Sequence, residues 1–199
     1  MYQLEALRFY ITNIFLFAFL FCGGQNCPQP TDSLFMPYYA KKALKKVDDL
    51  GFMLTIISDK TTDPLEANTA IDNAVKLFID EDATVQVSNT RDTSYKNNFK
   101  IRDYLKRVKA LKYDKIEIEW TSIQYVSNLR LGDDGSFHGV ISYEQKFRGI
   151  RDNKIVYGDM VTKNTLVVVT PQKLELEGQT FMCWDVFLSD IEVVQTLRQ

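Results

Sequence analysis

A single histidine limits the acid–base chemistry open to this chain. His138 is the only histidine among the 199 residues. It follows the turn at residues 132–135, in an alternating stretch where Phe137 and Ile141 mark one face. Alternate residues of a strand point to opposite faces, so we expect His138 on the outer, solvated face if the aromatic set points inward.

Metal and nucleophile chemistry have little support in the residue pattern. One histidine and separated cysteines cannot assemble a zinc-type ligand cluster. No serine lies in the elbow motif of a Ser-His-Asp hydrolase. The sequence therefore predicts neither a metal nor a cofactor.

Carboxylates in the later strands are the candidate general bases. Asp185 shares one face of its predicted strand with Phe181, Cys183 and Phe187. If that face points inward, the carboxylate lies among aromatic rings, where burial raises its pKa. We expect the opposite arrangement, with Asp185 solvated and an inner face formed by Trp184, Val186 and Leu188. Asp159 presents the same two alternatives.

Aromatic residues are numerous enough to fill a core or to wall a pocket. We predict a lining set of six, namely Trp120, Phe137, Tyr143, Phe147, Phe181 and Phe187. If these rings fill the interior they form a core, which is the interpretation we favour; if they fill it in part they leave an apolar pocket.

Charge argues against a nucleic-acid partner. The net charge is −2, so no global field steers the protein onto nucleic acid. Lysine and arginine gather at residues 91–115 and at residues 41–46, but without the interleaved aromatics of a base-stacking surface. We interpret these groups as solvated helix faces; anionic lipid headgroups or an acidic partner are the alternatives.

The first 24 residues have the order of a signal peptide. A short start with Arg8 precedes an apolar run at residues 9–21, and Cys22-Gly23-Gly24 leads into polar sequence. The run has 13 residues, whereas a membrane-spanning helix needs ~20. We expect export, with residues 25–36 as a flexible mature N-terminus; an anchor helix or a buried core segment are the alternatives.

Three cysteines carry separate predictions. Cys22 follows the apolar run directly, where the lipidated residue of a bacterial lipoprotein lies, although Phe21 replaces the usual small residue before it. Cleavage after Gly24 without a lipid is the alternative. Cys27 and Cys183 would be able to pair in an oxidising compartment. We favour instead an exposed thiol and a buried strand cysteine.

Helical periodicity dominates the first half of the remaining chain. Residues 37–58 predict a long helix, in which Gly51 allows close approach of another element. Asp63-Pro64-Leu65-Glu66 predicts the start of a second helix that ends near residues 80–82. A short strand at residues 83–88, a polar loop at residues 89–98 and a third helix from Ile101 to Leu111 follow.

From Lys115 onward the apolar period changes to two. Alternation predicts four long strands, beginning near residues 116, 137, 156 and 181, with a turn at residues 151–154 and a longer link at residues 171–179. Short turns between consecutive strands indicate antiparallel neighbours. Strands this long bend, so helices on the concave side enclose a cone. We predict an α+β fold with a single domain over residues 37–199.

This order of elements resembles the cone-shaped NTF2-like superfamily, which includes SnoaL-like and ketosteroid-isomerase-like proteins. The residues that carry the resemblance are AIDNAVKLFIDEDATVQV at residues 70–87 and KIRDYL at residues 100–105. The sheet matches by order and length alone. The resemblance covers residues 37–196 and implies three helices packed on a strongly curved, mostly antiparallel sheet.

The resemblance implies several functions, since the superfamily contains both enzymes and binding domains. We predict an exported, non-catalytic binding or accessory module, located in the periplasm or envelope, that takes a small apolar ligand or an envelope protein. An isomerase or dehydratase that uses Asp185 with Tyr143 or Tyr125 is one alternative. A structural subunit that forms a homodimer through the outer sheet face is another.

Overall fold

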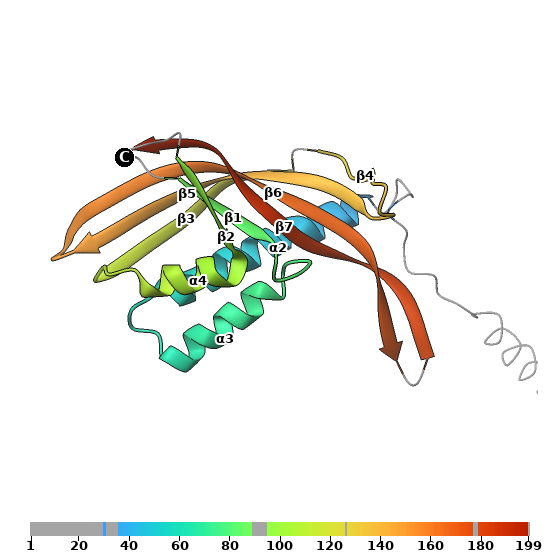
Figure 1. Cartoon of the computed structure of the whole chain (residues 1–199), viewed down its shortest axis with the longest axis horizontal. Helices are drawn as coiled ribbons and strands as arrows, with labels where there is room; N and C mark the ends of the chain where they lie inside the picture. Colours follow the sequence, from blue (N-terminus) through green and yellow to red (C-terminus); the bar gives the residue numbers. More distant parts are fainter. Residues whose placement is uncertain (1–29, 31–35, 89–94, 126, 177–178, 199) are drawn as a thin grey trace, which may run out of the picture.

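The computed structural model describes residue 30 and residues 36–88, 95–125, 127–176 and 179–198. Within these residues the chain is α+β, with helices α2, α3 and α4 and a seven-stranded sheet. Figure 1 shows the sheet as a strongly curved surface with the three helices on one side of it. The predictions for the apolar N-terminal run, for Cys22 and for Cys27 fall outside the described residues.

Helices α2 and α3 begin where their sequences predict. Helix α2 spans Met36–Ser58 and α3 spans Pro64–Val75. Asp63 caps α3, because its Oδ1 accepts hydrogen bonds from the backbone N–H groups of Leu65 at 2.8 Å and Glu66 at 3.4 Å. Pro64 occupies the first turn, where its missing N–H costs nothing.

Helix α3 ends earlier than the predicted boundary near residues 80–82. Its apolar stripe continues to Phe78, but that residue forms an isolated parallel bridge with Leu188. The N–H of Ile79 donates to the carbonyl of Leu188 at 2.8 Å, and the N–H of Leu188 donates to the carbonyl of Leu77 at 2.9 Å. Pairing with a distant strand therefore replaces the last predicted turn.

The polar segment before α4 is partly a strand. Strand β1 spans Thr84–Ser88 and pairs antiparallel with β2, Lys96–Lys100, which the sequence predicts as part of a loop. Helix α4, Ile101–Ala110, follows at once, and its buried residues Ile101, Leu105 and Val108 confirm the predicted face.

The long strands form the body of the sheet. They are β3, Lys115–Tyr125; β5, Phe137–Arg151; β6, Lys154–Leu176; and β7, Gln179–Arg198. The strand order is β2-β1-β7-β6-β5-β3, and the short β4, Arg130–Leu131, pairs with β5. All pairs are antiparallel except β1 with β7.

Turn chemistry sets the register of the β5–β6 hairpin. Asp152 and Asn153 have φ angles of 50° and 58° between the paired residues Arg151 and Lys154. Two central residues with positive φ define the turn whose twist matches a hairpin, and Asp and Asn tolerate it. The predicted link at residues 171–179 is instead mostly strand, since β6 and β7 stay paired as far as Leu176 and Gln179.

The core joins the helices to the concave face of the sheet. Its fully buried side chains come from both, among them Val47, Leu50, Leu105, Ile141, Tyr143, Val167 and Leu188. The indole ring of Trp120 packs on Gly51, where an added Cβ would lie 3.4 Å from the ring. The close approach predicted at Gly51 is thus confirmed. No helix in the described part of the chain is long and apolar enough to cross a membrane.

Candidate functional site

A cavity lies between helix α4 and the concave face of the sheet. Its volume is about 270 Å³, near the lower end of the range for small-molecule sites, roughly 300 to 1,000 Å³. Its walls come from α4, from the segment after it and from strands across the sheet. They are formed by Val87, Ser88, Phe99, Tyr104, Arg107, Val108, Leu111, Tyr113, Ile118, Gln145, Phe147, Tyr157, Asp159, Val161, Lys163 and Val193.

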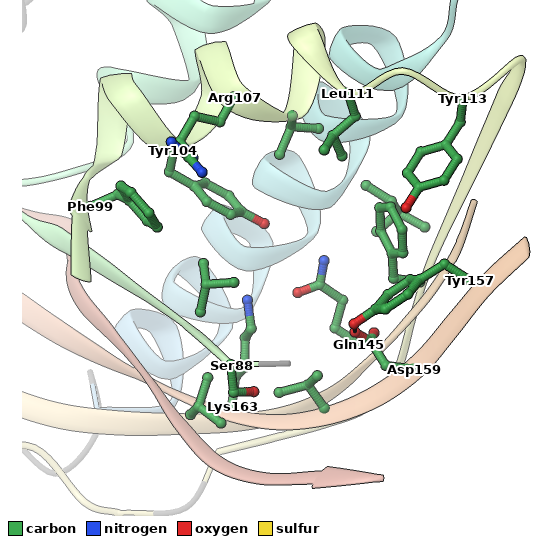
Figure 2. A pocket seen from close by; sticks show the side chains of 16 residues that line it. Ser88, Phe99, Tyr104, Arg107, Leu111, Tyr113, Gln145, Tyr157, Asp159 and Lys163 are labelled. Carbon is green, nitrogen blue, oxygen red and sulfur yellow. Dashed lines mark hydrogen bonds between the residues drawn. The ribbon is translucent and has the colours of Figure 1, made fainter. Parts of the chain in front are cut away.

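Lys163 places a buried cation in this cavity. The residue is 5% exposed, and its Nζ lies 5.5 Å from the centre of the Tyr104 ring. Figure 2 shows its amine pointing into the cavity between Tyr104 and Gln145. The amine forms no hydrogen bond or ion pair with another residue of the described chain. Burial lowers the pKa of Lys163 to about 8, against the attraction of Asp159.

Asp159 is the carboxylate of the cavity. It is 7% exposed, and the hydroxyl of Tyr157 donates to its Oδ2 at 2.6 Å. Burial raises the pKa of Asp159, while the Tyr157 hydrogen bond and the charge of Lys163 oppose that rise. Asp159, Val161 and Lys163 alternate along β6, so all three project from the same face of the strand into the cavity.

Two neutral polar side chains, Tyr104 and Gln145, also line the cavity. The Gln145 side chain is 5% exposed, and Figure 2 shows its amide on the same side of the cavity as the hydroxyl of Tyr104. Burial raises the pKa of Tyr104, so its phenol stays protonated and can donate. In the view of Figure 2 the Gln145 amide lies between the Lys163 amine and Asp159.

Aromatic rings form the apolar side of the cavity. The Phe147 ring makes edge contacts with Tyr113 at 6.1 Å and Tyr157 at 5.8 Å between ring centres. Gly149 allows the Tyr113 ring to lie close to the backbone of β5. A Cβ at residue 149 would lie only 2.5 Å from that ring. On another part of the lining, the Arg107 guanidinium lies 4.3 Å from the centre of the Phe99 ring.

These groups define what the cavity is able to do chemically. A desolvated ammonium, a carboxylate with a raised pKa and a phenol converge on one small space with apolar walls. Such a set can orient the polar head of a small ligand by hydrogen bonds and charge. The same set has the parts of a proton-transfer site, since pKa shifts caused by burial concentrate at functional sites.

The structure places Asp185 elsewhere. Val186 and Leu188 are fully buried on the inner face, and Asp185 forms an ion pair with Lys42 at 2.8 Å with a side chain 37% exposed. Asp185 is therefore not among the lining residues. Of its predicted partners, Tyr143 lies in the core, and the side chain of Tyr125 lies outside the described part of the chain.

His138 confirms the predicted outer face. Its side chain is 46% exposed, and its Nε2 lies 3.0 Å from the Asp134 Oδ1 in the preceding turn. The hydrogen bond with His138 lowers the pKa of Asp134. This pair lies on the surface, and neither member lines the cavity.

The six predicted aromatic residues are divided between cavity and core. Phe147 lines the cavity. Trp120 stacks on Tyr143 with 4.3 Å between ring centres, and Phe137 contacts Trp184 edge-on, so these rings pack in or against the core. Phe187 lies beneath the Lys46 ammonium at 5.4 Å, and Phe181 is half-buried near the beginning of β7. The core interpretation therefore describes half of the set, namely Trp120, Phe137 and Tyr143.

Lys163, Tyr104 and Gln145 were not among the predicted site residues. The sequence contains a signal that could have identified two of them, Gln145 and Lys163. Gln145 interrupts the inward series of β5 between Tyr143 and Phe147, and Lys163 interrupts that of β6 between Val161 and Thr165. A polar residue at an inward strand position is the informative kind of exception.

Cys183 is disulfide-bonded. The other two cysteines of the chain, Cys22 and Cys27, lie outside the described residues. The preferred prediction of a free, buried Cys183 is therefore wrong. Among the described residues, no group of three or more His, Cys, Asp or Glu side chains is arranged to hold a metal ion.

Comparison with known proteins leaves the family open. No family model, curated protein or solved structure matches this chain.

Proposed function

We propose that this protein is an exported, NTF2-like binding or accessory module whose cavity takes one small ligand. The observation that carries the proposal is Lys163, a nearly fully buried amine that faces a cavity of about 270 Å³ without a hydrogen-bond or ion-pair partner among the described residues. Burying a charge without a hydrogen-bond or ion-pair partner is costly, and such charges concentrate at functional sites. A bound ligand would supply the missing acceptor.

The fold supports this proposal. Helices α2 to α4 and the concave sheet meet in the arrangement expected of a cone, and the cavity lies between α4 and the strands. Apolar and aromatic residues dominate its walls, with a few convergent polar groups, as in typical ligand pockets.

Ligand-observed NMR with a fragment library tests the proposal. Val161→Phe would fill the cavity from the middle of its β6 wall, so hits should lose at least about ten-fold in affinity, the factor that 1.4 kcal/mol represents. Val156→Phe is the matched control, because Val156 lies on the same strand with 53% exposure and does not line the cavity. Hits that bind both variants equally, or a library without hits, would contradict the proposal.

Proton transfer is the second candidate function. It is favoured by Asp159, whose burial raises the pKa of a carboxylate that faces the cavity beside the Tyr157 hydroxyl. Asp159, in place of Asp185, would act as the base and a phenol as the donor to a developing oxyanion. Turnover of a small ketone substrate that disappears in Asp159→Asn, with binding retained, would establish an enzyme.

Export is part of the proposal. The disulfide at Cys183 supports it, since disulfides persist mainly in oxidising compartments. Expressed in a Gram-negative host, the chain should appear in the envelope fraction without its first twenty or so residues, as signal cleavage predicts. Recovery of the intact N-terminus from the cytosol would contradict export and leave the cavity proposal standing.

A further inference from the structure

The ionisable groups around the cavity are unequal in charge. Among the described residues that line it there are two cations, Lys163 and Arg107, and one carboxylate, Asp159. Asp159 already accepts a hydrogen bond from Tyr157, and its burial favours the neutral acid. Burial raises the pKa of the Tyr104 phenol, so that group adds no negative charge. The cavity therefore carries an excess of positive charge.

Lys163 holds the part of that charge that a ligand can use best. Its amine is buried, makes no ion pair with Asp159 and points into the open space beside Tyr104 and Gln145 (Figure 2). An ammonium has three donors. Hydrogen bonds between a desolvated ammonium and an anion are about twice as strong as neutral ones. An anionic acceptor satisfies this group better than a neutral one does.

The opposite wall selects for a flat apolar body. Phe147 contacts both Tyr113 and Tyr157 edge-on. A ligand ring that packs against these side chains from the cavity would make the same kind of offset or edge contacts. With a volume of about 270 Å³, the cavity suits a body of about one ring rather than a steroid-sized one.

We propose that the ligand is a small organic monoanion with an aromatic or similarly compact apolar body, whose carboxylate is bound by Lys163. This inference rests on the proposed binding function and adds the charge class of the ligand. Tyr104 and Gln145 are placed to donate further hydrogen bonds to the same head, and Arg107 adds positive charge at the lining of α4.

Three probes with one ring and three head groups test the charge class. Binding of phenylacetate, phenylacetamide and phenethylamine is measured by calorimetry at pH 6.5 and low salt. Phenylacetate should bind at least about 10-fold more tightly than the amide, as expected for a hydrogen bond to a charged group. The cation should bind most weakly.

Variants assign the preference to Lys163. Lys163→Met should remove the preference for phenylacetate over phenylacetamide, and Lys163→Gln, which keeps a hydrogen-bonding amide without the charge, should do the same. Lys146→Met is the matched control, since Lys146 projects to the other face of β5 and does not line the cavity. It should keep the preference.

The outcomes separate this inference from the function on which it rests. Equal or tighter binding of the amide, failure of all three probes, or a preference that survives in Lys163→Met overturns the anion assignment. If neutral or cationic fragments still bind and Val161→Phe displaces them, the binding function stands. If no fragment of any charge binds, both proposals fail.

Discussion

Replacing Lys163 by methionine should stabilise the protein. Methionine keeps the unbranched shape of the lysine stem and removes a charge that the fold buries at 5% exposure. Burial lowers the pKa of the lysine from 10.5 to about 8. The difference between these two pKa values corresponds to a penalty of about 3 kcal/mol at neutral pH, where the amine is charged in both the folded and the unfolded state. Lys163→Met should therefore raise the free energy of unfolding by about that amount.

The pH dependence gives the prediction its sign. Between pH 8 and 10.5 the unfolded chain holds a proton on Lys163 that the folded protein has released. The unfolded state then binds more protons, so the stability contributed by this group rises with pH in that window. The advantage of Lys163→Met over wild type should accordingly shrink by about 1 kcal/mol from pH 7 to pH 9.

Asp159 is already included in this magnitude, because the pKa of about 8 is the balance between the burial of Lys163 and its attraction to Asp159. In an Asp159→Asn background that attraction is absent, so Lys163→Met should stabilise the protein by more than it does in the wild-type background. Arg107 is the other charged group of the lining and is left unchanged.

Urea denaturation at both pH values, followed by tryptophan fluorescence, measures these differences. Lys146→Met serves as the control and should shift stability by less than about 0.5 kcal/mol, the range for an ordinary surface change. A Lys163→Met protein less stable than wild type would refute the reasoning. The interactions of the ammonium in the folded protein would then outweigh the cost of its desolvation. A stability difference that does not change with pH would refute the assigned pKa shift.

Three further variants test other parts of the structure. Trp120→Ala should cost roughly 3–5 kcal/mol, because the indole stacks on Tyr143 in the core; a denaturation midpoint close to wild type would instead assign the ring to a ligand-binding wall. His138→Ala should change stability by less than about 0.5 kcal/mol, since its pair with Asp134 is exposed, and a larger loss in thermal unfolding would contradict the surface assignment. Asp63→Ala removes the cap of α3 and should cost about 1 kcal/mol of stability. The conservative Asp63→Asn should retain most of the stabilisation by the cap, and equal losses of stability in both variants would argue against capping.

The sequence alone predicted the features that depend only on neighbouring residues. The cap at Asp63, the apolar face of α4 and the alternation of the long strands all depend on residues within a few positions of one another. The same alternation put His138 outside, because Phe137 and Ile141 are strongly apolar and fix the face that points inward.

Pairing between distant segments changed other boundaries. Strand β2 has the polar sequence KNNFK. It is a strand because its backbone pairs with the edge of β1. Helix α3 stops at Val75, because Phe78 and Ile79 pair with β7 more than a hundred residues later. Such choices depend on a partner that no local window contains.

The candidate site shows the same division. From the sequence alone, polar Lys163 and Gln145 stand at inward positions of apolar strands, and Asp159 is ambiguous between two faces. Only the tertiary structure brings these strands under α4, removes water from the ammonium and carboxylate, and leaves a cavity around them. Strand periodicity is a local property of the chain, whereas burial and pKa shifts arise from groups that meet only after the chain has folded.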